Sequence, residues 1–170
     1  EGRTPRKADR VAHDLLRQIV TGEAPVGSLL PRESELANRY QVNRSVVREA
    51  IKLLEVHRLV LPIRRRGTEV LDPLRSLSPE VLHALLTPRP GAVDQGMLAD
   101  LLEIRQGIDV QMVTLAAERR TAADLEAMER CLEQLRDALA NPKAYSDAIE
   151  ELALALARAA HNRVFVMLVH

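Results

Sequence analysis

Basic side chains recur at two places in the first half of this 170-residue chain. Arg44, Arg48 and Lys52 follow one another at steps of four residues, so on a helix they lie along one side. A run of arginines over residues 64–66 follows and ends at Gly67. Arginine can donate two hydrogen bonds to guanine in the DNA major groove, and it also binds phosphate oxygens. The pattern therefore favours binding to a nucleic acid duplex.

Two short helices are predicted to position the first group. Pro31 opens a helix over residues 32–40, because proline is tolerated in the first turn of a helix. After a two-residue break, Asn43 is expected to be the N-cap of the next helix, its side chain accepting a backbone N–H. Apolar residues at helical spacing form the buried face of that helix: Val47, Ala50, Ile51 and Leu54. The pair reads as a helix-turn-helix.

A hairpin is predicted to carry the second group. Residues 58–63 and 64–70 read as two strands joined by a turn with three arginines, a wing. An amphipathic helix over residues 7–21, with a buried stripe of Val11, Leu15, Leu16 and Ile19, precedes the helix-turn-helix. Leu29-Leu30 reads as a short strand that pairs with the wing.

The whole stretch resembles the winged helix-turn-helix of the GntR family of bacterial transcription regulators. Three motifs in order carry the resemblance: Leu30-Pro31-Arg32-Glu33-Ser34-Glu35-Leu36-Ala37, then Val42-Asn43-Arg44-x-x-Val47-Arg48-Glu49-Ala50, then Arg66-Gly67-Thr68-x-Val70. The resemblance implies a DNA-binding set: Arg32, Asn43, Arg44, Ser45, Arg48, Arg64, Arg65, Arg66 and Gly67. Arg44 and Arg48 would contact bases, whereas Asn43 and Ser45 would contact phosphates. Capping alone is the other interpretation of Asn43.

The chain departs from the family pattern at three positions. An arginine of the first motif is replaced by Ser34, and Arg32 two residues earlier is a candidate substitute. The turn glycine is Gln41 here, and the wing-tip glycine is Arg65. If those positions need positive φ, each non-glycine residue costs on the order of 1 kcal/mol.

Composition and charge set the general class. The single cysteine, Cys131, excludes an intramolecular disulfide and a cysteine-based zinc cluster. No apolar run approaches the roughly 20 residues of a membrane span, and no signal-peptide pattern is present, so a cytoplasmic protein is expected. The resemblance to the GntR family further implies a bacterial protein associated with the nucleoid. Residues 1–75 hold 15 Lys/Arg against 10 Asp/Glu, a net of +5, and the remainder holds 9 against 14, a net of −5. This asymmetry fits a nucleic-acid reader joined to a second module.

The second half is predicted to be all-helical, with Ser78 and Thr121 as N-caps of two of its helices. It resembles the FCD effector domain of the FadR subgroup at Leu101-Leu102-Glu103-Ile104-Arg105, Leu115-Ala116-Ala117-Glu118-Arg119 and Asn162. The family's effector domain continues beyond His170, so the chain is expected to be a fragment. We therefore expect a mainly α protein: a winged helix-turn-helix over residues 1–72, a linker over 73–79, and a partial all-helical effector-binding and dimerisation domain over 80–170.

The resemblance also bears on the effector. Many relatives bind a metal through an Asp and a His one helical turn apart, but Ile149 and Ala153 occupy those positions, and neither can ligate a metal. Glu150 and Glu151 could be offset replacements, yet neither has a histidine four residues later. We therefore expect the effector to be a small organic acid or an acyl-CoA-like molecule. No metal or other cofactor should be required for its binding. Arg105 could bind its carboxylate, or could form an ion pair between helices.

The leading hypothesis is a sequence-specific, effector-controlled transcription regulator, most often a repressor, that binds a palindromic operator in double-stranded DNA as a homodimer. The alternatives are a winged-helix protein–protein interaction module and a metal-dependent regulator of the same family. An enzyme is not expected, because no nucleophile–base spacing, phosphate-binding glycine loop or HExxH motif is present. Partners in a membrane are not expected.

Overall fold

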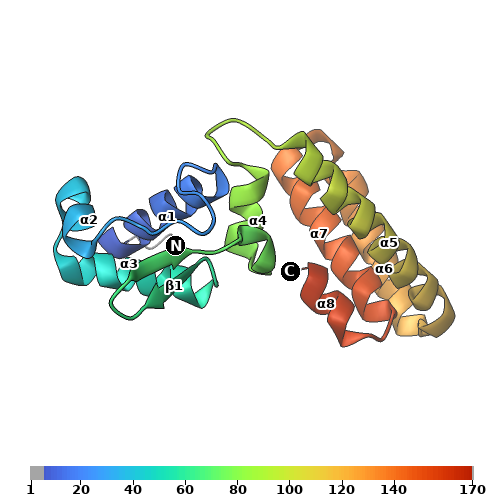
Figure 1. Ribbon diagram of the computed structural model, residues 1–170. Helices are drawn as coiled ribbons and strands as arrows, with labels where there is room; N and C mark the ends of the chain where they lie inside the picture. The colour runs from blue at the N-terminus through green and yellow to red at the C-terminus, as the bar shows by residue number, and fades with distance from the viewer. Residues whose placement is uncertain (1–5, 170) are drawn as a thin grey trace. The chain divides into compact units, whose positions relative to one another are not determined.

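The computed structural model describes residues 6–169 of the chain (Figure 1). They fall into two compact units, the first ending at Ala99 and the second beginning at Asp100. Both are mainly helical, and the first also holds a two-stranded antiparallel sheet. The predicted fold class, three helices with a small wing followed by a helical domain, is confirmed.

The first unit follows the predicted order closely. The helix predicted over residues 32–40 begins one residue later, after Arg32, and the arginine run forms the turn between the two strands. Its elements are α1 (Lys7–Val20), α2 (Glu33–Tyr40), α3 (Arg44–Val56), β1 (Val60–Ile63), β2 (Gly67–Val70), the 3-10 turn η1 (Pro73–Arg75) and α4 (Pro79–Leu86).

One apolar core holds these elements together. The predicted stripe of α1 is buried against the predicted stripe of α3. Leu36 of α2 and the strand residues Val60 and Val70 complete this core, and all three are at most 1% exposed. Burial of each such side chain contributes roughly 1.5–3 kcal/mol, so the wing is attached to the same core as the helices.

The wing is a short hairpin extended by a third segment. Val60 pairs with Val70 and Ile63 with Gly67 in the antiparallel register. The predicted pairing of Leu29-Leu30 is confirmed, because Leu29 bridges Glu69 and the Leu30 N–H donates to the Thr68 carbonyl at 2.8 Å. This third segment joins the chain before α2 to the base of the wing.

Helix α4 packs with the first unit. Ser78 caps it as predicted, accepting from the Val81 N–H at 3.2 Å, and proline occupies its first turn. Val81 and Ala84 are buried in the core that α1 and α3 form. Residues 79–86, which the sequence analysis divided between the linker and the effector domain, therefore lie with the winged helix-turn-helix by packing.

The second unit contains α5 (Gln95–Arg119, which starts in the first unit), α6 (Ala122–Asp137), the 3-10 turn η2 (Ala138–Ala140), α7 (Pro142–Ala159) and α8 (Arg163–Val169). The predicted cap at Thr121 forms, its hydroxyl accepting from the Asp124 N–H. Alanines of α7 pack against Met112 and Ala116 of α5 and against Phe165 of α8. These small side chains allow the helices to approach closely.

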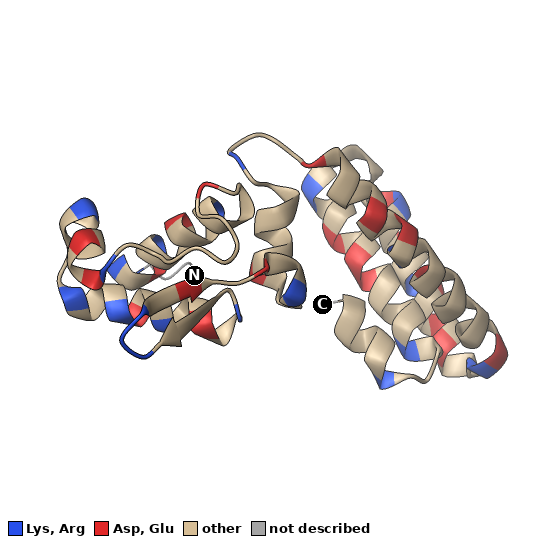
Figure 2. Cartoon of the chain, in the orientation of Figure 1, with Lys and Arg blue, Asp and Glu red and all other residues tan. Residues whose placement is uncertain are grey.

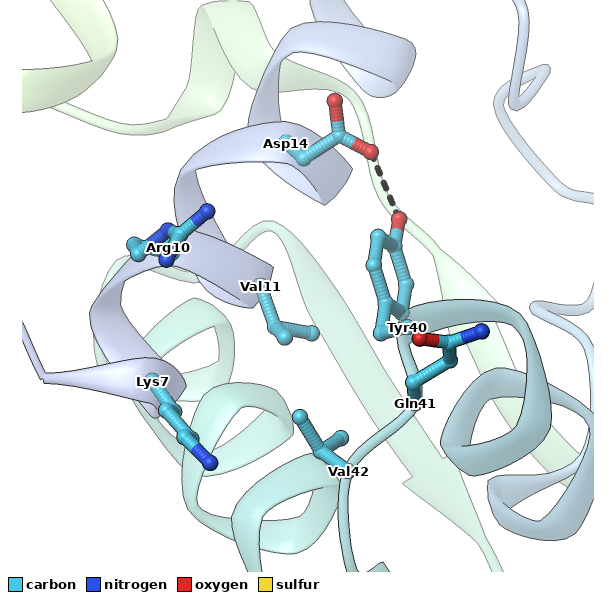
Figure 3. A pocket seen from close by; sticks show the side chains of 7 residues that line it. All are labelled: Lys7, Arg10, Val11, Asp14, Tyr40, Gln41 and Val42. Carbon is cyan, nitrogen blue, oxygen red and sulfur yellow. Dashed lines mark hydrogen bonds between the residues drawn. The ribbon is translucent and has the colours of Figure 1, made fainter.

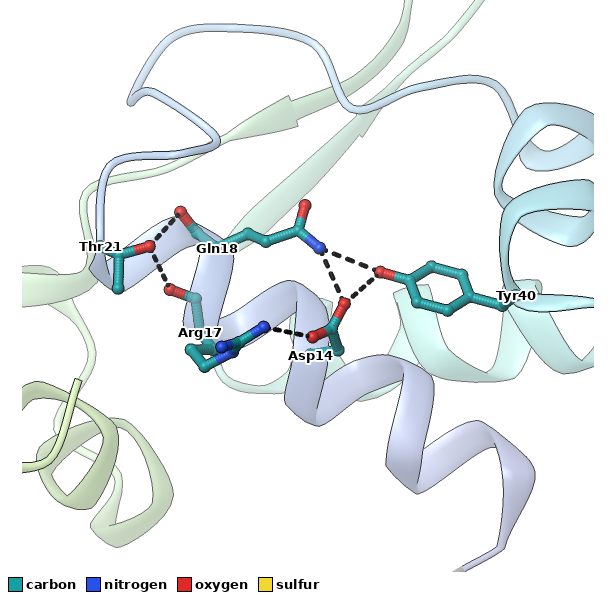
Figure 4. Close-up of polar contacts among 5 residues, drawn as sticks. All are labelled: Asp14, Arg17, Gln18, Thr21 and Tyr40. Carbon is teal, nitrogen blue, oxygen red and sulfur yellow. Dashed lines mark hydrogen bonds and ion pairs between the residues drawn. The ribbon is translucent and has the colours of Figure 1, made fainter. Parts of the chain in front are cut away.

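A polar network that the sequence analysis did not foresee joins α1 to α2 (Figure 4). Asp14 accepts hydrogen bonds from the Tyr40 hydroxyl at 2.7 Å, from Gln18 Nε2 at 2.8 Å and from Arg17 Nη2 at 2.9 Å. Burial acts to raise the pKa of Asp14, but these donors outweigh it and hold the pKa below the ordinary value. Burial and the bond to Asp14 raise the pKa of Tyr40 to about 12, so its hydroxyl remains a donor.

We expect Tyr40→Phe to lower the free energy of unfolding by about 1–2 kcal/mol at pH 7, because one donor to a half-buried carboxylate is lost. A carboxylate with a lowered folded-state pKa contributes stability above its unfolded pKa, and this contribution is lost as pH falls through the folded value. The difference in free energy of unfolding between Tyr40→Phe and the unaltered protein should therefore become smaller under acid conditions. Urea titrations at several pH values measure it.

Tyr145→Phe is the matched control, since Tyr145 lies at the surface of α7. Equal stability of the two variants at pH 7 would show that the Tyr40–Asp14 contact does not hold α1 to α2.

Candidate nucleic-acid interface

The first half of α3 presents the polar residues of the predicted DNA-binding set to solvent. Asn43, Arg44, Ser45 and Arg48 are all exposed, and so is Lys52 one turn further on. Asn43 occupies the N-cap position, but its side chain makes no capping hydrogen bond. The predicted side-chain cap is therefore wrong, and the Asn43 amide is not engaged in capping.

Arg48 is held by an acidic side chain of α2. Its Nε donates to Glu33 Oε2 at 2.7 Å, and the Arg48 side chain remains 64% exposed. An exposed ion pair of this kind contributes only about 0–1 kcal/mol. Arg48 can therefore exchange Glu33 for another acceptor at small cost.

The wing brings its arginines toward the start of α3. Arg64, Arg65 and Arg66 are exposed in the turn between β1 and β2, which is marked in blue in Figure 2. A hollow of about 680 Å³ lies between this turn and the starts of α2 and α3. Five members of the predicted set line it: Arg32, Arg44, Arg65, Arg66 and Gly67. The fold thus gathers arginines from three segments around one concave surface.

Both predicted glycine replacements stand in the left-handed region of backbone space. Gln41 has φ 51° and ψ 47° after α2, and Arg65 has φ 63° at the wing tip. The Val42 N–H donates to the Ala37 carbonyl at 3.0 Å, which closes α2 as glycine-ended helices are closed. Both turns therefore have a backbone conformation that glycine favours, and each carries the steric cost of a Cβ at positive φ.

Charged residues at the start of α1, which the sequence did not single out, also lie near α3. Glu49 is exposed on the outward side of α3, and Arg6 Nη1 lies 4.0 Å from its carboxylate. Lys7 and Arg10 of α1 line a hollow of about 480 Å³ beside Val42, just before α3 (Figure 3). Their spacing of three residues on the polar side of α1 was the available signal.

In the helical unit, Arg105 pairs within its own helix. Its Nε lies 3.4 Å from Asp109 Oδ2 one turn later, and both side chains are largely exposed. The sequence analysis gave an ion pair between Arg105 and another helix as one alternative. The ion pair that forms is instead within α5. His161 Nε2 lies 3.0 Å from Asp124 Oδ2, so this isolated histidine helps to order the start of α6.

Metal ligands are not assembled in residues 6–169. Ile149 lies exposed and Ala153 half-buried on α7, and the described residues contain no group of three or more His, Cys, Asp or Glu that could hold a metal ion. Within the same residues, none of the helices combines the length and hydropathy of a membrane span.

Each half of the chain contains a region that matches a known protein family. Residues 7–70 match the family model of bacterial regulatory proteins of the gntR family, and residues 100–170 match the FCD domain. The chain is 29% identical over 167 residues to the galactonate operon transcriptional repressor of Escherichia coli K12. It is 32% identical over 165 residues to the Glc operon transcriptional activator of the same strain. These relatives are transcription regulators and not enzymes, as predicted.

The chain spans 72% of the length of the first relative and 61% of the second, while 97% and 92% of the chain itself are covered. Among solved structures it resembles Lar, which controls the Listeria monocytogenes agr system, with a TM-score of 0.55 and 23% identity. That match covers 99% of this chain and 70% of Lar, and it supports the fold.

We expect Gln41→Gly to stabilise the protein by about 0.5–1 kcal/mol, because relief of the Cβ at positive φ exceeds the added entropy of the unfolded chain. Gln41→Ala keeps the Cβ and is the control, so it should give no such gain. Thermal and urea unfolding compare the two. If Gln41→Ala raised the free energy of unfolding by the same amount, the gain would come from loss of the glutamine side chain beyond Cβ and not from relief of backbone strain.

Proposed function

The chain belongs to the GntR family of bacterial regulatory proteins, with the FCD domain of its FadR subgroup, and we propose that it binds a DNA operator in a sequence-specific and effector-controlled manner. The hollow between α2, α3 and the wing carries this proposal, because arginines from all three segments line it. A duplex is the partner with phosphates and guanine edges spaced to meet such a surface.

In the proposed complex, α3 enters the major groove with its N-terminal residues toward the base edges. Arg44 lies in the first turn of α3 and would donate two hydrogen bonds to a guanine. Arg48 would leave Glu33 to reach a second base, while Asn43 and Ser45 would contact phosphates. These contacts set the orientation of α3 in the groove.

The wing and the start of α2 would contact the flanking backbone. Arg64, Arg65 and Arg66 are exposed in the turn of the hairpin, where they would meet phosphates or enter a minor groove. Arg32, at the N-cap of α2, would contact a phosphate across the hollow. The Gly67 backbone lets the hairpin approach the duplex closely.

A homodimer would place one α3 in each half of a palindromic operator, one helical turn apart. The helical unit would bind a small organic acid or an acyl-CoA-like effector without a required metal, and Arg105 would exchange Asp109 for a carboxylate of the effector. Repression is the proposed mode, in the cytoplasm at the nucleoid. The effector acts by favouring one of two arrangements of the dimer.

We expect Arg44→Ala and Arg48→Ala each to weaken operator binding by about 1–3 kcal/mol, roughly ten- to a hundredfold, through loss of a guanine contact. Fluorescence anisotropy at fixed salt, with a duplex selected from random oligonucleotides by the unaltered protein, measures the affinity. Arg75→Ala is the control, because Arg75 is exposed in η1 outside the hollow. Affinities unchanged from this control would remove Arg44 and Arg48 from the interface.

Operator affinity should also fall steeply with salt. Six or more phosphate contacts by the wing and α3 imply roughly 10³-fold loss between about 50 and 200 mM salt, because bound counterions are released from DNA. Repeating the anisotropy titration with Arg64→Gln should flatten the slope of log affinity against log salt by about 1. A shallow slope in the unaltered protein would argue against the wing as a phosphate contact.

A further inference from the structure

A second basic hollow lies in the first unit, away from the arginines of α3 and the wing. It measures about 330 Å³ and is formed by α1, the end of α4 and the loop that follows α4. His13 and Arg17 line it from α1, His83 from α4, and Arg89 from the loop. All the ionisable side chains that line this hollow, among the residues that the structure describes, are histidine or arginine.

The loop that carries Arg89 is fixed by local hydrogen bonds. Pro90 and Gly91 form the centre of a turn, closed by the Ala92 N–H donating to the Arg89 carbonyl at 3.0 Å. Gly91 has φ 74°, as the third position of a type II turn requires. The Asp94 N–H donates to the Leu86 carbonyl at 2.8 Å and ties the loop back to α4. The backbone at Arg89 is thus fixed at the rim of the hollow that α1 also lines.

Arg17 is paired with Asp14 at 2.9 Å, outside the lining of the hollow, and this pair leaves part of its guanidinium available to a ligand. Asp14 already accepts from Tyr40, Gln18 and Arg17. Arg17 has five N–H donors, of which the contact with Asp14 uses one nitrogen. The side chains of His13 and Arg89 take part in none of the hydrogen bonds or ion pairs between described residues.

We propose that this hollow binds a phosphate group, either as inorganic phosphate or as the phosphate ester of a small metabolite. Donors reach it from α1, α4 and the loop, whereas the Thr87 hydroxyl, which also lines it, already donates to the His83 carbonyl at 2.8 Å. A tetrahedral oxyanion offers oxygens in several directions and can satisfy donors on three sides, whereas a carboxylate offers only two oxygens in one plane. The volume lies within the range of small-molecule sites.

A bound phosphate would fasten α4 to α1. His13 and Arg17 lie on one side of it, and His83 and Arg89 on the other, so Arg17 and Arg89 would both be attracted to the same anion and the two histidine rings could donate to its oxygens. The segment over residues 79–91 would then open less often. This inference does not rest on DNA binding, so it can be tested independently of the proposed function.

Isothermal titration of the whole chain tests it, with potassium phosphate, glucose 6-phosphate and glucose as separate ligands at constant ionic strength. We expect saturable binding of one phosphate group per chain, and none of glucose. Arg89→Gln should weaken binding roughly tenfold, because a charged donor is lost. Arg75→Gln removes the same charge outside the hollow and should bind as the unaltered protein does. Phosphate should also slow amide hydrogen exchange in residues 79–86.

Tighter binding of glucose 6-phosphate than of phosphate would support an ester as the ligand, and equal binding would support the phosphate group alone. The proposal is overturned if neither ligand saturates at millimolar concentration. It is also overturned if Arg89→Gln, shown by circular dichroism to be folded, binds as well as Arg75→Gln.

Discussion

The buried face of α3 decides which side chains of this chain can meet DNA. Val47, Ala50 and Leu54 are packed against α1 with at most 2% of their surface exposed. Because a helix turns once in about 3.6 residues, burying this face leaves Ser45, Arg48 and Lys52 outside. Val60 and Val70 enter the same core, so the arginine turn of the wing is attached to the body that orients α3. The proposed interface depends on that shared core.

Acidic side chains reduce the net positive charge of the surface that α3 and the wing form. Glu33 holds Arg48, and Glu49 lies on the outward side of α3 with Arg6 close by. A surface of arginines alone would be attracted to any duplex through its phosphates. In the proposed complex, a contact between Arg48 and DNA would replace its ion pair with Glu33 at a cost of only about 0–1 kcal/mol. Glu33 would therefore lower the net positive charge of the surface more than it would alter specificity.

Local patterns in the sequence predicted most of the fold. Helical periodicity located the buried faces of α1 and α3, and caps at Ser78 and Thr121 marked helix starts correctly, because these signals involve residues at most four apart. What the sequence missed joins distant residues. Asp14 and Tyr40 are 26 positions apart, and Glu33 and Arg48 are 15 apart. The packing of α4 on the first unit is equally non-local, and so is the grouping of arginines in the hollow, whose contacts with DNA remain a prediction.

A crystal structure of the chain bound to its selected operator would show whether α3 and the wing contact DNA. We expect α3 in the major groove, with the Arg44 guanidinium within hydrogen-bonding distance of guanine O6 and N7, about 2.7–3.2 Å. We also expect Arg48 to have left Glu33, and the arginine turn of the wing to lie against the DNA backbone. A complex in which α3 faces solvent, or in which the duplex contacts neither Arg44 nor the wing, would contradict the proposed interface.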